Sequence, residues 1–300
     1  MISFSNVTPS DKAWMQPILL SADTKSADYS FVNIYAWAEY YHLQAAGIGD
    51  RVATRFCGDG RAVYAFPVGS GPLKPAMDAI LQDAAERGET ALITGVTEEM
   101  EREIAALYPD EYTAVPYPEG FDYLYSTEKL ASLAGKKLHG KRNHIHKFEA
   151  AHPDWSFAPL TQADIPDCRA LARKWLEALE GDKTQAEAET RAMELCFRDF
   201  EALDMVGGVL RVGGETVGFT MASPISADTL DVHFEKADGN MEGAYTMVNR
   251  EFARFIRETK PHILWLNRED DMGLENLRRA KRSYYPEIIL QKSALLWKRE

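Results

Sequence analysis

The feature that most constrains the fold is an ordered succession of helices and strands in the second half of the sequence. From residue 157 onward, apolar stripes and alternating segments predict helix, helix, strand, strand, strand, helix, strand, helix and strand. The first two strands, 206–212 and 216–222, are separated by Gly213-Gly214, a strong signal for a hairpin. This half is therefore expected to contain an antiparallel sheet flanked by helices.

The first half repeats a looser version of the same order: helix, hairpin, helix, strand and helix. Residues 26–41 place apolar side chains at helical spacing, and 109–118 is punctuated by proline and predicted to be irregular. We therefore expect an α/β (α+β) protein with two related domains, each a mixed, mainly antiparallel sheet flanked by helices. The expected boundaries are 1–128, a basic interdomain segment at 129–156, and 157–300.

Composition excludes several classes of protein. The net charge of −12 argues against a non-specific nucleic-acid binder. The three cysteines lie far apart and suggest neither a disulfide framework nor a CxxC site, which fits a reducing compartment. The N-terminus does not read as a signal peptide, and no apolar run approaches the length of a membrane span. We expect a cytoplasmic protein without a membrane span.

The element order resembles the GNAT acyltransferase fold, and four strings make the resemblance more specific. They are SADYSFVNIYAW (26–37), GKKLHGKRNHI (135–145), EGAYTMVNREF (242–252) and LNREDDMG (266–273). These strings resemble a bacterial family related to the C-terminal domain of phosphatidylglycerol lysyltransferase. The wider relatives are tandem-GNAT proteins that include the Fem-type aminoacyl transferases, and the resemblance spans essentially the whole chain.

The resemblance implies two tandem GNAT-like domains and a transferase that moves an acyl or aminoacyl group to an amine or hydroxyl. The donor would be acyl-CoA or aminoacyl-tRNA, used as a co-substrate, with no tightly bound cofactor. The expected partners are a small-molecule or peptide acceptor and, for the second donor, tRNA. The membrane domain of the lysyltransferase has no counterpart in this sequence, which argues against a membrane lipid as acceptor. The sequence leaves the donor, the acceptor and the oligomeric state open.

One candidate cofactor-binding motif is the segment 238–245, which follows a strand and opens a helix. Backbone N–H groups at a helix N-terminus can hold a phosphate, and small residues such as Gly243 and Ala244 allow close approach. Together with Tyr245 they form a candidate contact for CoA. The match to the acetyl-CoA signature of the fold is partial, because Glu242 places an acid there. An ordinary strand-to-helix turn is the competing interpretation.

Candidate catalytic residues lie at the ends of two predicted strands. Ligands in open α/β sheets favour the carboxyl ends of strands. Asn267 and Arg268 could orient a carbonyl, and Asp270 could bind or deprotonate an amine. Glu235 is a candidate base at the end of the preceding strand. A polar loop that caps the next helix explains 267–273 equally well.

The basic stretch 135–152 contains four of the seven histidines, but their spacing does not match a helical metal site, and we expect no metal. If 133–151 is one helix, its basic side chains could share a broad face that contacts the phosphates of CoA or tRNA. A solvated interdomain helix is the alternative. The candidate phosphate contacts are Lys136, Lys137, Lys141 and Arg142.

The sequence contains no nucleophile elbow, Walker loop or GxGxxG, which favours direct transfer over a covalent intermediate. The main hypothesis is therefore a soluble acyl- or aminoacyltransferase that works by direct transfer. The alternative is a non-catalytic GNAT-like module that binds a peptide or metabolite. A tRNA-binding factor without transfer activity fits the net charge of −12 least well.

Overall fold

A computed structural model describes residues 1–58, 60–179 and 183–298. The chain forms two compact units. The first unit contains Met1–Tyr123, Glu269–Arg278 and Ile289–Glu300, and the second contains Leu124–Arg268 and Arg279–Ile288. This grouping differs from the three ranges expected from the sequence, because the basic stretch belongs to the second unit and the last strand to the first.

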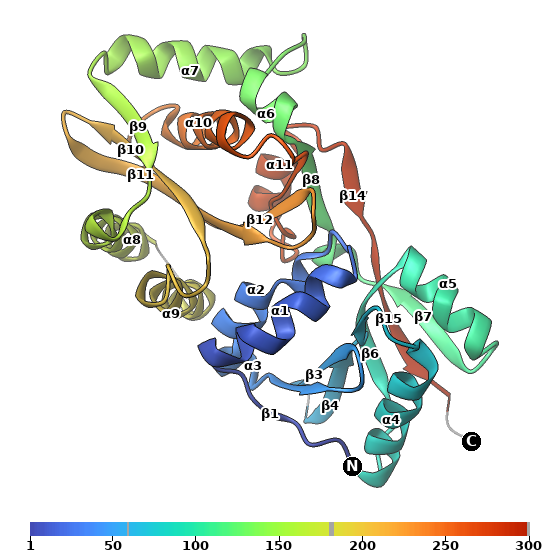
Figure 1. Ribbon diagram of the computed structural model, residues 1–300. Helices are drawn as coiled ribbons and strands as arrows, with labels where there is room; N and C mark the ends of the chain where they lie inside the picture. Colours follow the sequence, from blue (N-terminus) through green and yellow to red (C-terminus); the bar gives the residue numbers. More distant parts are fainter. Residues whose placement is uncertain (59, 180–182, 299–300) are drawn as a thin grey trace. The chain divides into compact units, whose positions relative to one another are not determined.

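The first unit is built on a sheet with strand order β1-β2-β3-β4-β6-β15-β7, and β5 pairs with β3 (Figure 1). Only the β4–β6 pair among the described pairs of this sheet is parallel; the others are antiparallel. The strands are β1 Ser5–Asn6, β2 Gln44–Gly47, β3 Arg51–Gly58, β4 Arg61–Ala65, β5 Val68–Gly69, β6 Leu92–Thr97, β7 Tyr112–Pro116 and β15 Lys292–Trp297.

Helices pack on this sheet through apolar stripes. In α4, Ala76, Met77 and Ile80 are fully buried, as the spacing i, i+1, i+4 requires for one helical face. The side chain of Thr97 caps α5 by accepting a hydrogen bond from the Met100 N–H. The helices of the first unit are α1 Lys12–Ser21, α2 Phe31–Ala36, α3 Ala38–Tyr41, α4 Leu73–Glu86 and α5 Glu98–Leu107.

The sheet of the second unit has the order β14-β8-β13-β12-β11-β10-β9. The predicted hairpin is confirmed: β10 and β11 pair with Val212 opposite Glu215, and both Gly213 and Gly214 have positive φ, as a two-residue hairpin turn requires. Strands β12 and β13 are parallel. The strands are β8 Asp122–Ser126, β9 Trp155–Pro159, β10 Val206–Val212, β11 Glu215–Pro224, β12 Thr229–Ala237, β13 Trp265–Asn267 and β14 Ile288–Leu290.

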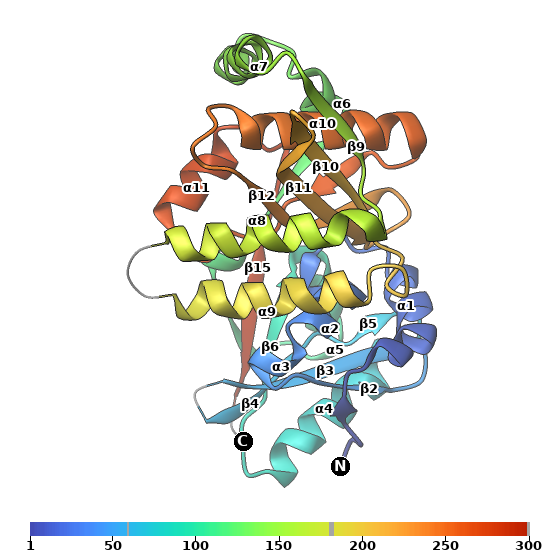
Figure 2. The same ribbon diagram turned by 90° about the vertical axis from the view of Figure 1, so that its left-hand side faces the viewer.

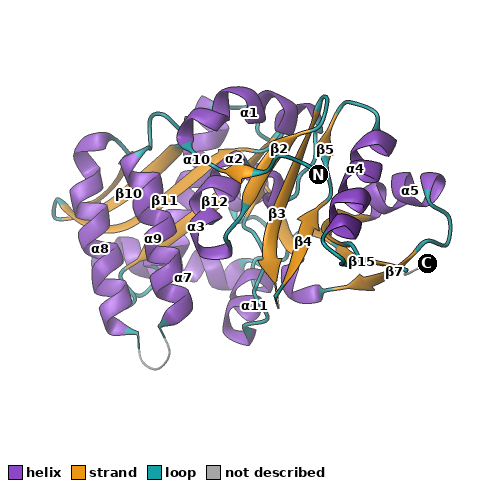
Figure 3. Cartoon of the chain, turned by 90° about the horizontal axis from the view of Figure 1, so that it is seen from below, coloured by secondary structure: helices purple, strands orange, loops and turns teal. Residues whose placement is uncertain are grey.

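Helices α10 and α8 cover opposite faces of this sheet (Figure 2), and α9 lies against α8 (Figure 3). Lys236 connects strand β12 to both α8 and α9. Its ammonium is 2.8 Å from the Glu189 carboxylate of α9 and 3.4 Å from the ring centroid of Trp175 of α8. The remaining helices are α6 Thr127–Ser132, α7 His139–Ala151, α8 Ile165–Ala178, α9 Thr184–Arg198, α10 Ala244–Thr259 and α11 Glu275–Arg282, with short 3-10 turns at Pro9–Asp11, Ala27–Tyr29, Pro118–Gly120 and Gln162–Asp164.

Both units are thus mixed, mainly antiparallel sheets flanked by helices, and the predicted fold class is confirmed. Three local predictions were wrong. The stretch 26–41 is divided into α2 and α3, 109–118 contains strand β7, and the closing strand is divided into β14 and β15. Among the described residues, no helix is both long and apolar enough to cross a bilayer.

A buried cluster of charges holds the last strand in the first unit. Lys292, the first residue of β15, is fully buried, and its ammonium lies 2.8 Å from Asp122 and 2.9 Å from Asp28. The second oxygen of Asp122 accepts a hydrogen bond from the Ala27 N–H at 2.9 Å. Although burial alone would lower the pKa of Lys292, the two carboxylates raise it well above its usual value. Three distant segments therefore depend on one ammonium group.

We predict that Lys292→Met lowers the free energy of unfolding by about 3–5 kcal/mol, because it leaves the buried Asp122 carboxylate without its cation. Lys298→Met is the matched control. The Lys298 ammonium is exposed and donates to the Asp110 carbonyl, so this change should cost less than about 1 kcal/mol. Urea unfolding of both variants measures the difference, and equal losses would contradict the central role of Lys292.

Candidate functional site

The second unit contains an ion pair at the end of strand β13. Arg268 directly follows β13, and Glu235 lies on the adjacent parallel strand β12. The Nη2 of Arg268 donates to Oε1 of Glu235 at 2.7 Å, and both side chains are largely buried. The other carboxylate oxygen accepts from the Asn249 side chain of α10 at 3.3 Å. The two predicted catalytic residues Glu235 and Arg268 are thus brought into contact.

Aromatic rings surround the guanidinium of Arg268. Its central carbon lies 5.1 Å from the ring centroid of Tyr284 and 5.8 Å from that of Tyr125. Although burial alone would lower the pKa of Arg268, the Glu235 carboxylate raises it, so the guanidinium stays charged. Its Nη1 is buried and has no hydrogen-bond partner among the described residues. This donor is available to a ligand.

Lys141 of α7 is the third charged member of this cluster. Its ammonium lies 3.9 Å from the ring centroid of Tyr284. Burial, together with the positive charge of Arg268, lowers the pKa of Lys141 to about 8, although Glu235 acts in the opposite direction. Lys141 is therefore a group that exchanges a proton near neutral pH, as a general acid or base must.

The cluster of Lys141, Arg268 and Glu235 has two cations for one carboxylate when Lys141 is protonated. Such an excess of positive charge in a partly desolvated place favours an anionic oxygen or a polarised carbonyl. The cluster can therefore bind an acyl group and stabilise the negative charge that develops during its transfer.

The other basic candidates have different positions. Helix α7 begins at His139, so Lys136 and Lys137 lie before it and are exposed. The hypothesis of one broad basic face on a helix over 133–151 was therefore wrong. Leu133 and Gly135 have positive φ, which no continuous α-helix allows. Arg142 donates from Nη1 to the carbonyls of these same two residues and so fixes the turn before the helix.

The candidate phosphate turn at the start of α10 packs against α7. Glu242 pairs with Lys147 at 2.8 Å and lies 3.5 Å from His144. Gly243 has φ 92°, and a Cβ there would lie 2.6 Å from the carbonyl oxygen of His144. The close approach that requires glycine at position 243 is thus made by the α7 backbone at His144. Next to it, Ala244 is buried and Tyr245 is exposed.

The last two predicted catalytic residues are not part of the cluster. Asn267 is fully buried within β13. Asp270 belongs to the first unit, where its Oδ1 accepts a hydrogen bond from the Met272 N–H at 3.0 Å. The catalytic roles of Asn267 and Asp270 remain predictions.

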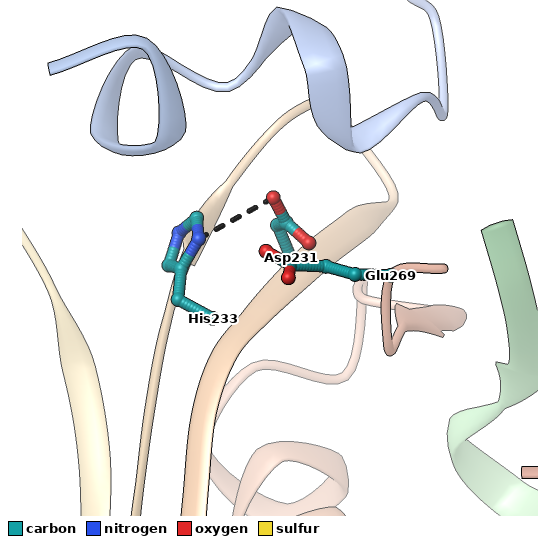
Figure 4. Close-up of side chains that lie close together, drawn as sticks. All are labelled: Asp231, His233 and Glu269. Carbon is teal, nitrogen blue, oxygen red and sulfur yellow. Dashed lines mark ion pairs between the residues drawn. The ribbon is translucent and has the colours of Figure 1, made fainter. Parts of the chain in front are cut away.

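A buried histidine lies between a hydroxyl and a carboxylate in the second unit. His233 Nε2 is 2.8 Å from Ser223 Oγ. The Nδ1 of His233 is 3.5 Å from an oxygen of Asp231, and Figure 4 shows this second contact. The order Ser–His–Asp matches that of a hydrolase triad. However, Ser223 is only 2% exposed, so its hydroxyl is not open to a substrate. The arrangement is a buried polar network of the sheet.

Sequence reasoning missed the aromatic members of the cluster, Tyr284 and Tyr125. Tyr284 follows α11, and its hydroxyl lies 3.4 Å from Thr246 Oγ1. The Tyr125 hydroxyl donates to the Lys281 carbonyl at 2.7 Å, and the Lys281 ammonium donates to the Arg268 carbonyl. The available signal was a tyrosine pair directly after a basic helix.

The comparison with protein families decides the affiliation of the chain. The family model described as "Phosphatidylglycerol lysyltransferase, C-terminal" matches residues 21–295. The chain belongs to this family. The resemblance found in the four sequence strings is thereby confirmed.

Solved structures of similar proteins support the same fold. A conserved protein of unknown function from Bacteroides thetaiotaomicron is 35% identical, with a TM-score of 0.93 over 99% of this chain and 100% of that chain. L-PGS from Bacillus licheniformis is 13% identical, with a TM-score of 0.72 over 100% and 95%. FemX is 9% identical, with a TM-score of 0.57 over 97% of each chain. The last two likenesses show the fold alone.

The proton affinity of Lys141 gives the first test of the cluster. We predict that Arg268→Met raises the pKa of Lys141 from about 8 towards that of an ordinary lysine, because a neighbouring positive charge is removed. Glu235→Gln should lower it further, because the opposing carboxylate charge is lost. The pH dependence of the acetylation rate of Lys141, followed by mass spectrometry, measures both shifts.

Lys147, which is exposed on the same helix, serves as the internal reference for reagent reactivity in each digest. If both substitutions shift the pKa of Lys141 in the same direction, or neither shifts it, the electrostatic account of the cluster is wrong.

The glycine at the start of α10 gives a second test. We predict that Gly243→Ala costs about 2 kcal/mol or more, because φ is positive and the new Cβ would meet the His144 carbonyl. Gly239→Ala is the control, since a Cβ there meets nothing within 4 Å and φ lies outside the positive region. It should change the free energy of unfolding by less than about 0.5 kcal/mol. Chemical denaturation that gives similar values for both would refute this account.

Proposed function

We propose that this protein transfers an acyl or aminoacyl group directly from a donor to the amine or hydroxyl of a small-molecule or peptide acceptor. The observation that carries the proposal is the cluster of Lys141, Arg268 and Glu235 in a chain of this family. The family description names a lysyltransferase, which supports transfer of an aminoacyl group.

In the proposed reaction, Arg268 binds the carbonyl oxygen of the acyl group. Its buried Nη1 is the free donor for this contact, and its charge stabilises the oxyanion that forms on attack. Glu235 holds the guanidinium through Oε1 and is itself held by Asn249 through Oε2. We therefore assign Glu235 a positioning role, because both of its carboxylate oxygens are already engaged, one by Arg268 and one by Asn249.

Lys141 moves the proton. With a pKa of about 8, a fraction of Lys141 is neutral at neutral pH and can accept the proton of the attacking amine or hydroxyl. Attack forms the new C–N or C–O bond and the oxyanion, and collapse of the oxyanion breaks the C–O bond to tRNA or the C–S bond to CoA. The protonated Lys141 then returns the proton to the leaving oxygen or sulfur. Atoms and charge balance without a covalent enzyme intermediate.

Of the two donors, we propose aminoacyl-tRNA. The turn at Gly243 carries the acid Glu242 and packs against the His144 carbonyl, which disfavours the pyrophosphate of CoA at this place. Lys136 and Lys137 are exposed before α7, where they are accessible to the phosphates of a tRNA acceptor end.

The direct test measures transfer of a labelled group from lysyl-tRNA, other charged tRNAs and acetyl-CoA to phosphatidylglycerol vesicles, dipeptides and polyamines. We expect product above spontaneous hydrolysis with an aminoacyl-tRNA. Product from acetyl-CoA alone would identify the other donor and overturn our choice. No transfer from any donor would contradict the proposed function.

Substitutions then test the roles. Arg268→Met and Lys141→Met should each lower kcat about 100-fold, because each removes a group that stabilises or completes the transition state. Lys147→Met, on the exposed side of the same helix, should stay within about twofold of the unchanged protein. Glu235→Gln keeps a hydrogen-bond acceptor for Arg268 and should lose less activity than Arg268→Met. A larger loss would restore Glu235 as the base.

A further inference from the structure

An exposed tyrosine, Tyr285, lies next to the cluster of Lys141, Arg268 and Glu235 but has no part in the proposed reaction. It directly follows Tyr284, whose ring contacts both Lys141 and Arg268. The two neighbouring tyrosines differ in burial, because Tyr284 is 5% exposed and Tyr285 is 43% exposed. Tyr285 therefore presents an aromatic ring to solvent beside the residues that would bind the acyl group.

The backbone of Tyr285 has an unusual conformation. Its φ is 55°, a value that a bulky side chain rarely adopts and that costs free energy unless the surroundings hold it. Two hydrogen bonds hold it here: the Tyr285 N–H donates to the Arg282 carbonyl at 2.9 Å, and the Tyr285 carbonyl accepts from the Lys129 ammonium of α6. Strain of this kind is concentrated at binding and catalytic sites, which favours a binding role for this exposed ring.

Positive charge lies close to the Tyr285 ring. The Lys137 ammonium is 5.3 Å from the ring centroid. Lys137 belongs to the stretch 129–148 and Tyr285 to the stretch 276–286, and neither stretch contains Asp or Glu. The exposed basic side chains of the two stretches include Lys136, Arg279 and Arg282. Two segments without acids thus meet at this ring, although the chain as a whole has a net charge of −12.

Glu287 follows the second of these stretches, and its charge is offset by Lys129. The Glu287 carboxylate lies 3.3 Å from the Lys129 ammonium. It also accepts hydrogen bonds from the Ser126 N–H at 3.3 Å and the Ser126 hydroxyl at 3.2 Å. The surface made by Lys136, Lys137 and Tyr285, here called the Tyr285 surface, therefore combines positive charge with an exposed ring. All of these residues belong to the second unit.

An exposed aromatic ring beside cations is the combination with which proteins bind single-stranded nucleic acid. Bases stack on the ring whatever their sequence, and the cations contact the phosphates. Cations alone would attract an acidic peptide or an anionic bilayer as well. The ring of Tyr285 adds affinity for a partner with a planar face, and an unpaired base has one.

We propose that Tyr285 stacks on an unpaired base at the 3′ end of the tRNA donor, while Lys137 contacts a neighbouring phosphate. The inference rests on the proposed function, in which the acyl group lies at Arg268 and Lys141. That group is esterified to the ribose of the last nucleotide, so the base on the same ribose lies within one nucleotide of the cluster. Tyr285, one residue from Tyr284, can receive this base or the one before it. Tyr285 is thus a positioning residue that orients the acyl group through the base.

Binding of a short single-stranded oligoribonucleotide with 2-aminopurine as its last base tests the proposal, because stacking quenches the fluorescence of this base. With the full chain, Tyr285→Leu should weaken binding about tenfold and abolish most of the quenching, whereas Tyr285→Phe keeps the ring and should stay within about twofold. Tyr40→Leu is the matched control, since Tyr40 is 40% exposed in the first unit, and it should change neither quantity. Equal losses in the Leu and Phe variants, or full quenching by Tyr285→Leu, would overturn the proposal.

The salt dependence of binding tests the phosphate contact. Lys137→Met should weaken binding about threefold and reduce the slope of log affinity against log salt concentration by about 0.7, as expected for one lost contact to a single strand. Lys74→Met is the matched control, because the Lys74 ammonium lies 5.0 Å from the ring centroid of Tyr108 in the first unit. It should leave the slope unchanged. The same slope in both variants would contradict the proposal.

The oligoribonucleotide carries no acyl group, so its binding is measured independently of transfer. Stacking on Tyr285 without transfer from any donor would support the Tyr285 surface and contradict the proposed function. Transfer that Tyr285→Leu leaves unchanged, with no quenching by the unchanged protein, would contradict the role of Tyr285 alone. Binding of phosphatidylglycerol vesicles in place of the oligoribonucleotide, weakened by Tyr285→Leu and Lys137→Met, would assign the surface to a membrane and refute the inference.

Discussion

The buried ammonium of Lys292 is the interaction on which the first unit depends. It neutralises Asp122 at the start of β8 and contacts Asp28 in the segment before α2, while Asp122 also fixes the Ala27 N–H. Two charges removed from water gain little net stability, but a missing partner is costly. The contacts of Lys292 therefore matter mainly because losing one partner leaves a buried charge. Strand β15 lies between β6 and β7, with Lys292 in contact with both carboxylates.

This placement gives the first unit a non-local topology. Its sheet includes a strand from the end of the chain, and residues 269–278 belong to this unit although they follow most of the second unit in sequence. The second unit, by contrast, is mostly contiguous and contains the tight β10–β11 hairpin. Contacts between distant segments require closure of long loops and form slowly. We therefore expect the second unit to fold first, with docking of β15 completing the first.

The sequence predicted those parts of the fold that depend on local chemistry. Gly213-Gly214 specified the hairpin, and the apolar stripe of α10 specified its helix, because each signal lies within a few residues of the structure it produces. Long-range pairing left no such signal. Nothing near Lys292 indicates that its partners lie at 28 and 122. Strand β7 was missed for a similar reason, since Pro116 and the flanking Pro109 and Pro118 suggested a loop, while β15 supplies its ladder of hydrogen bonds.

For the candidate site, too, the sequence indicated which residue types are present but not the role of each residue. Glu235 and Arg268 were predicted from their positions at the ends of strands, and Lys141 from the basic stretch. However, only the packing against Tyr284 distinguishes Lys141 from its exposed neighbours. Burial lowers the pKa of Lys141, whereas the side chains of Lys136 and Lys137 are exposed. The net charge of −12 is equally uninformative about sites. It is a sum over the whole chain, in which a cationic cluster in one unit and the acidic residues of an aromatic-lined pocket in the other are counted together. Function in such a chain depends on where charge is desolvated, which the fold alone decides.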